Sequence, residues 1–207
     1  MPRSKTSPPP ARRSWAALLI RNVLLWLIPV GLLWGLLTPA YNRFLLGSAE
    51  NLLHLTESPD VTDLPRLDRH RAYVQRRDFP PAKSLVRQFR VTDVHFHFLL
   101  LGALFLAVPG IPWRQRLENL GWAVLITIFF DIFLLFFFVK SVYAIQLGDW
   151  SLSHYGPFAR NAYGLARHLL DLPFKLALPL LLWAGFYLER MLGERVAPRA
   201  SGGGGST

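Results

Sequence analysis

Cysteine is absent from this sequence, and charged residues are scarce in it. The lack of cysteine excludes a thiol nucleophile, a disulfide framework and a thiolate metal site. Charged residues make up 17% of the 207 residues and hydrophobic residues 52%, so a soluble chain of this size would have too little charge to cover its surface. This apolar content also excludes disorder over most of the chain. Whether the apolar residues are dispersed or gathered then decides between a soluble core and a membrane protein.

The apolar residues are gathered in four blocks. Each block is close to the roughly 20 residues, range 17–25, that cross a hydrocarbon core. In lipid the backbone must satisfy its own hydrogen bonds, so each block is predicted to be a helix. The predicted fold is an all-α membrane protein whose four transmembrane helices cover 15–38, 96–113, 120–140 and 172–190.

Basic residues indicate how these spans are oriented. A net charge of +10 would suggest nucleic acid as the partner of a soluble chain, but in a membrane protein Lys and Arg first mark the cytoplasmic ends of the spans. The segments predicted to be cytoplasmic are a basic tail over 1–14, a turn over 114–119 that carries Arg114 and Arg116, and a flexible Gly/Ser-rich tail over 191–207. Both termini are therefore predicted to be cytoplasmic. A signal peptide is the alternative for the first block, but no clean small-x-small cleavage site follows Leu37, which favours an uncleaved anchor.

The first segment predicted to lie outside the cytoplasm is 39–95. Apolar residues at helical spacing predict an interfacial helix over Tyr41–Leu55, separated from the first span by a break at Pro39. The alternative is that these residues extend the first span. Short strands are predicted over Arg71–Arg77 and Leu85–Thr92, paired across 78–81 as a small β-hairpin-like insertion.

The second such segment is 141–171. Gly148-Asp149-Trp150 is typical of a turn. Pro157 suits the first position of a helix, and a second interfacial helix is predicted from Pro157 to about Leu170. Its predicted apolar face consists of Phe158, Ala162, Leu165, Ala166 and Leu169.

All six histidines fall on the predicted extracytoplasmic side. Imidazole is a common metal ligand, which makes His95, His97 and His154 weak metal candidates. No HExxH pattern or other ligand spacing accompanies them, so neither a metal nor another cofactor is predicted. The sequence also lacks a Gly-rich phosphate loop, a serine nucleophile elbow and any nucleic-acid-binding signature, and no nucleic-acid partner is predicted.

Two charged residues lie inside predicted spans. Asp131 is near the middle of the third span and Lys175 is about one turn inside the outer end of the fourth. At 1.5 Å per residue their depths differ by about 7–8 Å, which a lysine side chain could largely bridge if the helices were neighbours. One hypothesis is a proton or substrate relay at Asp131; the favoured one is a buried polar contact that pins helices together.

Two short motifs carry a resemblance to a known family. An apolar helix here ends in Pro109-Gly110-Ile111-Pro112-Trp113-Arg114-Gln115-Arg116, and a span is followed by Tyr41-Asn42-Arg43-Phe44-Leu45. The first motif is similar to a segment of exosortase-system membrane proteins, and the whole plan, over roughly 15–192, resembles the exosortase H-associated membrane protein family. The resemblance implies a bacterial inner-membrane protein that is a non-catalytic partner of a protein-sorting transpeptidase. Exosortases use Cys, Arg and His, so a chain without cysteine cannot be that enzyme by that mechanism.

The favoured function is thus an accessory subunit in protein sorting or envelope biogenesis, in contact with membrane lipids and another membrane protein. One alternative is a membrane enzyme whose extracytoplasmic His/Asp site acts on lipid or glycan. Another is a small transporter subunit that uses Asp131. The residues predicted to contact a partner or substrate are Asp149, His154, Arg160, Asn161 and His95.

Overall fold

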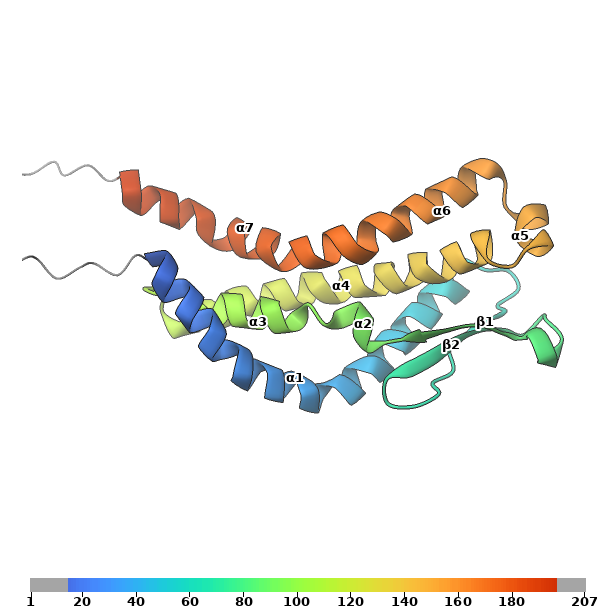
Figure 1. The fold of residues 1–207 in the computed structure, drawn as a ribbon, viewed down its shortest axis with the longest axis horizontal. Helices are drawn as coiled ribbons and strands as arrows, with labels where there is room; N and C mark the ends of the chain where they lie inside the picture. Colours follow the sequence, from blue (N-terminus) through green and yellow to red (C-terminus); the bar gives the residue numbers. More distant parts are fainter. Residues whose placement is uncertain (1–14, 197–207) are drawn as a thin grey trace, which may run out of the picture.

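The computed structural model describes residues 15–196; the predicted tail 1–14 and residues 197–207 of the predicted C-terminal tail lie outside the described residues. The described chain is mostly helical and carries a small antiparallel sheet of three strands. Its long helices run along the long axis of the molecule (Figure 1). They are α1 (Trp15–His54), α3 (Phe98–Ala107), α4 (Trp113–Ile145), α6 (Pro157–Leu169) and α7 (Lys175–Val196). The central helix is α4, which contacts α1, α3, α6 and α7.

Two of these helices, α1 and α4, are long and apolar enough to cross a membrane. The other two predicted spans coincide with shorter apolar helices, over Thr92–Ala107 and Lys175–Leu188. At 1.5 Å per residue, a helix of 40 residues such as α1 is about 60 Å long, roughly twice the thickness of a hydrocarbon core. Part of α1 must therefore lie beyond any bilayer that it crosses.

The predicted break at Pro39 is wrong, because α1 is one continuous helix from Trp15 to His54. Pro39 removes one backbone donor, and the Thr38 hydroxyl donates to the Trp34 carbonyl at 2.7 Å. Both features bend helices without ending them, and α1 curves along its length (Figure 1). The apolar face predicted to lie on a membrane instead packs in a protein core, where Leu45, Ala49 and Leu53 are fully buried.

The predicted strands exist and pair as expected. Strand β2 (Arg71–Arg76) is antiparallel to β3 (Leu85–Arg90), and the short helix η1 (Pro81–Lys83) lies in the connection between them. A third strand, β1 (Thr62–Asp63), pairs with the other edge of β2. It was not predicted, because two residues carry no readable alternation.

The predicted cytoplasmic turn 114–119 is helical, since α4 begins at Trp113. The connection from α3 occupies 108–112 instead, with Gly110 at φ 78°, a conformation that favours glycine. Arg116 closes this connection by donating to the Leu106 carbonyl at 2.8 Å and to the Ile111 carbonyl at 2.9 Å. The predicted second span is correspondingly shortened to α2 (Thr92–His95) and α3. In α3, a Cβ at Gly102 would lie 2.8 Å from Val30, so this glycine permits the close approach of α1.

The predicted helix after Pro157 is confirmed as α6, with Pro157 in its first turn. It continues through a π-helical stretch over Leu170–Phe174 directly into α7. The predicted turn before it is a short helix, α5 (Asp149–His154), which follows Gly148 at φ 60°.

Helix α6 is packed the opposite way round from an amphipathic helix in a soluble protein. Its apolar residues Phe158 and Leu165 are 86% and 61% exposed. The face against α4 carries Tyr163, beside Phe137, and Arg167, whose guanidinium lies 5.0 Å from the ring centroid of Phe138. In water an amphipathic helix normally buries its apolar stripe and solvates its polar one, whereas α6 leaves Phe158 and Leu165 exposed.

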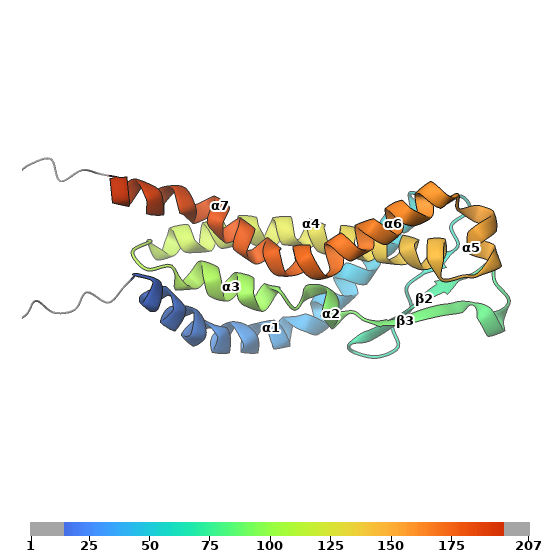
Figure 2. The same cartoon turned by 45° about the horizontal axis from the view of Figure 1, so that its top comes forward.

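The two ends of the molecule differ. The start of α1, the connection between α3 and α4, and the end of α7 lie at one end, while the sheet and α5 lie at the other in both views (Figures 1 and 2). We call the sheet with its loops, the last turns of α4 and α5, residues 55–91 and 140–156, the cap. A core cluster of α1, α4 and sheet residues joins the cap to the helices, and a second cluster centred on Phe105 of α3 lies among the helices alone.

Candidate functional site

Several buried polar residues gather where α1 meets α2, α3 and α4. Asp131 of α4 is 0% exposed. The Tyr41 hydroxyl of α1 donates to its Oδ2 at 2.8 Å, and Nε2 of His97 lies 3.3 Å from its Oδ1. These two atoms are close, but they are not aligned for a hydrogen bond. Asp131 therefore faces protein, and its closest polar partner is a tyrosine hydroxyl from the first helix.

Asn42, the next residue on α1, makes the second half of this cluster. Its Nδ2 donates to the Arg69 carbonyl at 2.8 Å, and its Oδ1 lies 2.6 Å from Nε2 of His95. Because the amide nitrogen is occupied by a carbonyl, the amide oxygen must be the acceptor toward His95. Nε2 of His95 therefore carries a hydrogen. We call Tyr41, Asn42, His95, His97 and Asp131 the polar cluster.

Aromatic rings enclose the polar cluster. Trp34 stacks on Phe98 with ring centroids 4.4 Å apart, and the Tyr41 ring meets His95 edge-on at 5.0 Å. These contacts join α1 to α2 and α3 around groups that are themselves bonded across helices. The bonds and ring contacts together favour one arrangement of these helices, because breaking a buried hydrogen bond leaves a polar group unpaired at a cost.

Lys175 is not the partner of Asp131. It is buried, and its Nζ donates to Asp171 at 2.5 Å and to the Asp93 carbonyl at 2.9 Å. Instead of the direct pair that neighbouring helices would have allowed, Lys175 makes an i,i+4 pair in the continuous helix of α6 and α7 and a contact with α2. Similar depth along two helices does not determine which of their side chains face each other.

The residues predicted to contact a partner do not all reach the surface. Asp149, His154 and Asn161 are exposed, and Arg160 is half-buried. His95 is 1% exposed, so its selection as a contact residue is wrong. The sequence placed His95 next to the predicted insertion, whereas the structure turns its ring inward onto Asn42.

The predicted weak metal candidates are not brought together either. His95 and His97 belong to the buried polar cluster, whereas His154 stacks on Trp150 in the cap at a centroid distance of 4.1 Å. Within residues 15–196, one group has ligand atoms close enough for a metal: Glu50, His54 and Asp63, within 4.8 Å of one another. Each already has a protein partner: Glu50 accepts from the Leu64 amide, His54 contacts the Thr62 carbonyl, and Asp63 pairs with Arg77. The contacts of these three residues hold β1 against the end of α1.

The cap contains a groove of about 490 Å³ whose lining includes Glu57, Arg76, Lys140, Trp150 and His154. On one side, the Arg76 guanidinium lies over Trp150 at 4.3 Å and over Tyr143 at 4.8 Å. Asp78 accepts from it twice, at 2.9 and 2.6 Å. This hydrogen bonding lowers the pKa of Asp78. Burial alone would lower the pKa of Arg76. The hydrogen bonds to Asp78 and its negative charge outweigh burial, so the pKa of Arg76 is raised.

A second ion pair lines the same groove. Nζ of Lys140 lies 3.1 Å from Oε1 of Glu57, and the two side chains are 8% and 9% exposed. The same carboxylate oxygen accepts from Thr62, whose hydroxyl is 2.8 Å from that of Tyr143. Sequence reasoning missed this network, since no spacing along the chain links residues 57, 62, 76, 140 and 143. Part of the polar cluster was visible in the sequence, because Tyr41 and Asn42 begin one of the two motifs that carry the family resemblance.

Comparisons of the chain with protein-family models, with curated proteins and with solved structures find no match. Its function must therefore be argued from the geometry of these sites.

Proposed function

We propose that this protein is a multi-pass inner-membrane accessory subunit, a non-catalytic partner in exosortase-type protein sorting or envelope biogenesis. The observation that carries the proposal is the polar cluster, in which Tyr41, Asn42, His95 and Asp131 bond to each other or to backbone across helices. Bonds of this kind between helices organise a fold, and this is the role we propose for the polar cluster.

A membrane location accounts for the exterior of the helices. Large apolar side chains are exposed along α1, including Leu32 at 74% and Leu36 at 78%. Phe158 and Leu165 of α6 are likewise exposed, and so many large apolar side chains at the surface are unusual for a soluble monomer. Four spans follow if the shorter helices over Thr92–Ala107 and Lys175–Leu188 cross beside α1 and α4.

The orientation follows from the distribution of basic residues. Arg114 and Arg116 begin α4 at the end of the molecule shared by the start of α1 and the end of α7 (Figure 2). The positive-inside rule assigns that end to the cytoplasm. The cap then faces the opposite side of the membrane, where sorting of exported proteins takes place.

The cap is the surface we propose for partner contact. It carries the groove and exposes Asp149 and His154, while Asn161 lies exposed on the helix that follows. Such a surface, aromatic with charges of both signs, suits recognition of another protein. The resemblance of the two motifs supplies the class of partner, a membrane-bound sorting transpeptidase.

Reporter fusions and variants test this proposal together. Fusions at Ala200 and Ser58 are expected to report cytoplasmic and exported locations, respectively; an exported signal at Ala200 contradicts the four-span topology. With an exosortase-type transpeptidase and its sorting substrate in one cell, a cap variant, Asp149→Lys with His154→Ala, should reduce processing of the substrate at unchanged protein level. The matched variant at the other end, Arg114→Gln, should leave processing intact. The reverse pattern would assign the contact to the cytoplasmic end.

The transporter hypothesis is separated by one further substitution. Asn at position 131 still accepts a hydrogen bond from Tyr41 but cannot ionise, so Asp131→Asn preserves a structural contact and removes a proton relay. Under the proposed function, Asp131→Asn supports wild-type processing. Loss of processing by a stably folded Asp131→Asn protein would favour the relay.

A further inference from the structure

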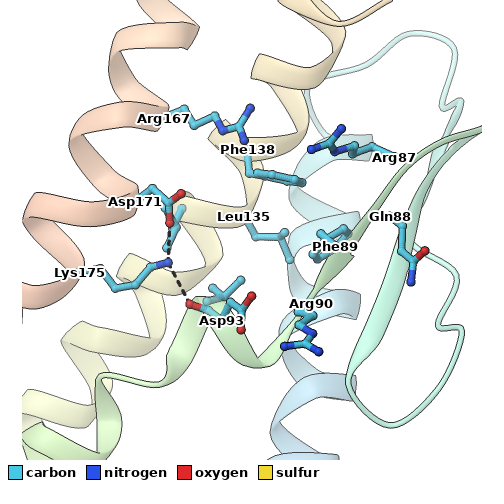
Figure 3. A pocket seen from close by; sticks show the side chains of 12 residues that line it. Arg87, Gln88, Phe89, Arg90, Asp93, Leu135, Phe138, Arg167, Asp171 and Lys175 are labelled. Carbon is cyan, nitrogen blue, oxygen red and sulfur yellow. Dashed lines mark hydrogen bonds and ion pairs between the residues drawn. The ribbon is translucent and has the colours of Figure 1, made fainter.

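A second pocket lies on another side of the molecule, between β3, α4 and the continuous helix of α6 and α7 (Figure 3). Its volume is about 240 Å³. The lining has an apolar part, formed by Phe89, Val94, Leu134, Leu135 and Phe138. Three of these residues, Leu134, Leu135 and Phe138, belong to the apolar stretch of α4 that is long enough to cross a membrane.

The remainder of the lining is strongly basic. Arg87, Arg90, Arg167 and Lys175 face two carboxylates, Asp93 and Asp171, which leaves an excess of two positive charges. Lys175 is the cation that is already neutralised, by Asp171 at 2.5 Å. We call this site the basic pocket.

The arginines of the basic pocket have no carboxylate partner among residues 15–196. Arg87 and Arg90 are exposed on β3, and Arg167 lies over the Phe138 ring at 5.0 Å. The guanidinium groups of Arg87 and Arg167 extend toward one another across the pocket (Figure 3). Two like charges that converge in this way repel each other, and an anion between them would turn the repulsion into two attractions.

The chemistry of the two arginines selects the kind of anion. A guanidinium presents a planar fork of donors that matches phosphate oxygens, so paired arginines are typical of phosphate sites. A free phosphate ion would make no use of the apolar floor beside them. An amphiphile with a phosphate headgroup uses both parts, because its chain can lie against Leu134 and Phe138.

We propose that the basic pocket binds the anionic phosphate headgroup of a membrane lipid, held between Arg87 and Arg167. This inference rests on the membrane location in the proposed function, because the apolar floor must lie at the depth of the acyl chains. It also gives α6 a role: its outward apolar face anchors the helix in the lipid interface, while Arg167 on its inward face reaches the headgroup. The binding site thereby joins the cap to the bilayer surface.

The test is a lipid titration of the purified full-length protein in mild detergent, read by native mass spectrometry. The probes are phosphatidylglycerol, which is anionic, and phosphatidylcholine, which carries a compensating cation. We expect phosphatidylglycerol to bind more tightly. Arg87→Gln and Arg167→Gln should each weaken its binding about tenfold, as expected for loss of a hydrogen bond to a charged group.

Arg66→Gln is the matched control, because Arg66 is exposed beside the sheet and outside the basic pocket; it should bind phosphatidylglycerol as the wild type does. Arg87 is also exposed, so Arg87→Gln keeps the test decisive if Arg167→Gln impairs folding. Equal binding of the two lipids by the wild type, or unchanged binding by Arg87→Gln, would overturn the proposal. Displacement of the lipid by equimolar inorganic phosphate would assign the pocket to a free anion and overturn the lipid assignment.

Failure here can be told apart from failure of the proposed function. If the protein spans the membrane but has no sorting partner, the lipid titration still succeeds and the processing assay fails. If the fusions at Ala200 and Ser58 contradict the four-span topology, the orientation in the proposed function fails, while the lipid titration still decides on the basic pocket by itself.

Discussion

The polar cluster and the cap both bury polar groups, but the bonds that stabilise those groups differ between the two regions. In the polar cluster the bonds are made by a tyrosine hydroxyl, an amide and a neutral donor on His95, around the single carboxylate of Asp131. In the cap the bonds join full opposite charges, Glu57 with Lys140 and Arg76 with Asp78. The cap lies beside an open groove, whereas the polar cluster is walled by aromatic rings.

This difference follows from the cost of charge in each setting. Far from water each full charge is costly, so bonds from a hydroxyl and an amide hold polar groups together there at a lower desolvation cost than further ion pairs would. Near water, a charged side chain keeps part of its hydration, so the cost of desolvating it is smaller. Ion pairs can therefore line a groove. Removal of one partner should therefore affect the two regions to different degrees.

The largest effect is expected at the buried pair in the cap. Glu57→Leu leaves Lys140 charged and unpaired, and loss of one partner from a buried pair typically costs about 3–5 kcal/mol. The free energy of unfolding, measured by denaturant titration in mixed micelles, should fall accordingly. The double variant Glu57→Leu/Lys140→Met removes both charges and should recover most of the loss. If the double variant is as unstable as the single one, the pair is not the cause.

A smaller loss is expected in the polar cluster. Asn42→Ala leaves Nε2 of His95 and the Arg69 carbonyl without partners, and each unsatisfied neutral group costs about 1–3 kcal/mol. The control is Arg43→Ala, because Arg43 is the next residue on α1 and is exposed. The same unfolding measurement should separate the two variants clearly, and equal stabilities would show that the amide of Asn42 is not a structural contact.

The sequence was informative wherever one segment carries its own pattern. Apolar blocks located the helices, and the prolines that punctuate the segment, with the connection over 78–81, located β2 and β3. It failed where the outcome depends on packing between segments. Pro39 is tolerated because Thr38 and the curvature of α1 accommodate it, and Tyr41 rather than Lys175 reaches Asp131 because α1 is the neighbour that presents a hydroxyl there. Pairings of this kind are set by distances in space, which spacing along the chain does not encode.

The smallest effect is expected from Asp78, and it depends on pH. The hydrogen bonds from Arg76 lower the pKa of Asp78 in the folded protein below the value of about 3.9 typical of an unfolded chain. The folded state thus favours the ionised carboxylate. This contribution to stability is fully present above the unfolded pKa and is lost as the pH falls through the lowered folded pKa.

Thermal unfolding followed between neutral pH and strongly acidic pH should show this contribution. The Tm of Asp78→Asn should lie below that of the wild type at neutral pH, and the two should converge as the pH falls from about 4 through the lowered pKa of the folded carboxylate. The shift is small because the Asp78 side chain is 38% exposed, and solvent screens an exposed pair. Asp60→Asn is the control, since Asp60 is exposed and has no ion-pair partner among the described residues. A difference in Tm between Asp78→Asn and wild type that stays constant down to the lowest pH would contradict this prediction. It would mean that the aromatic neighbours of Arg76, and not the charge of Asp78, stabilise the position of Arg76.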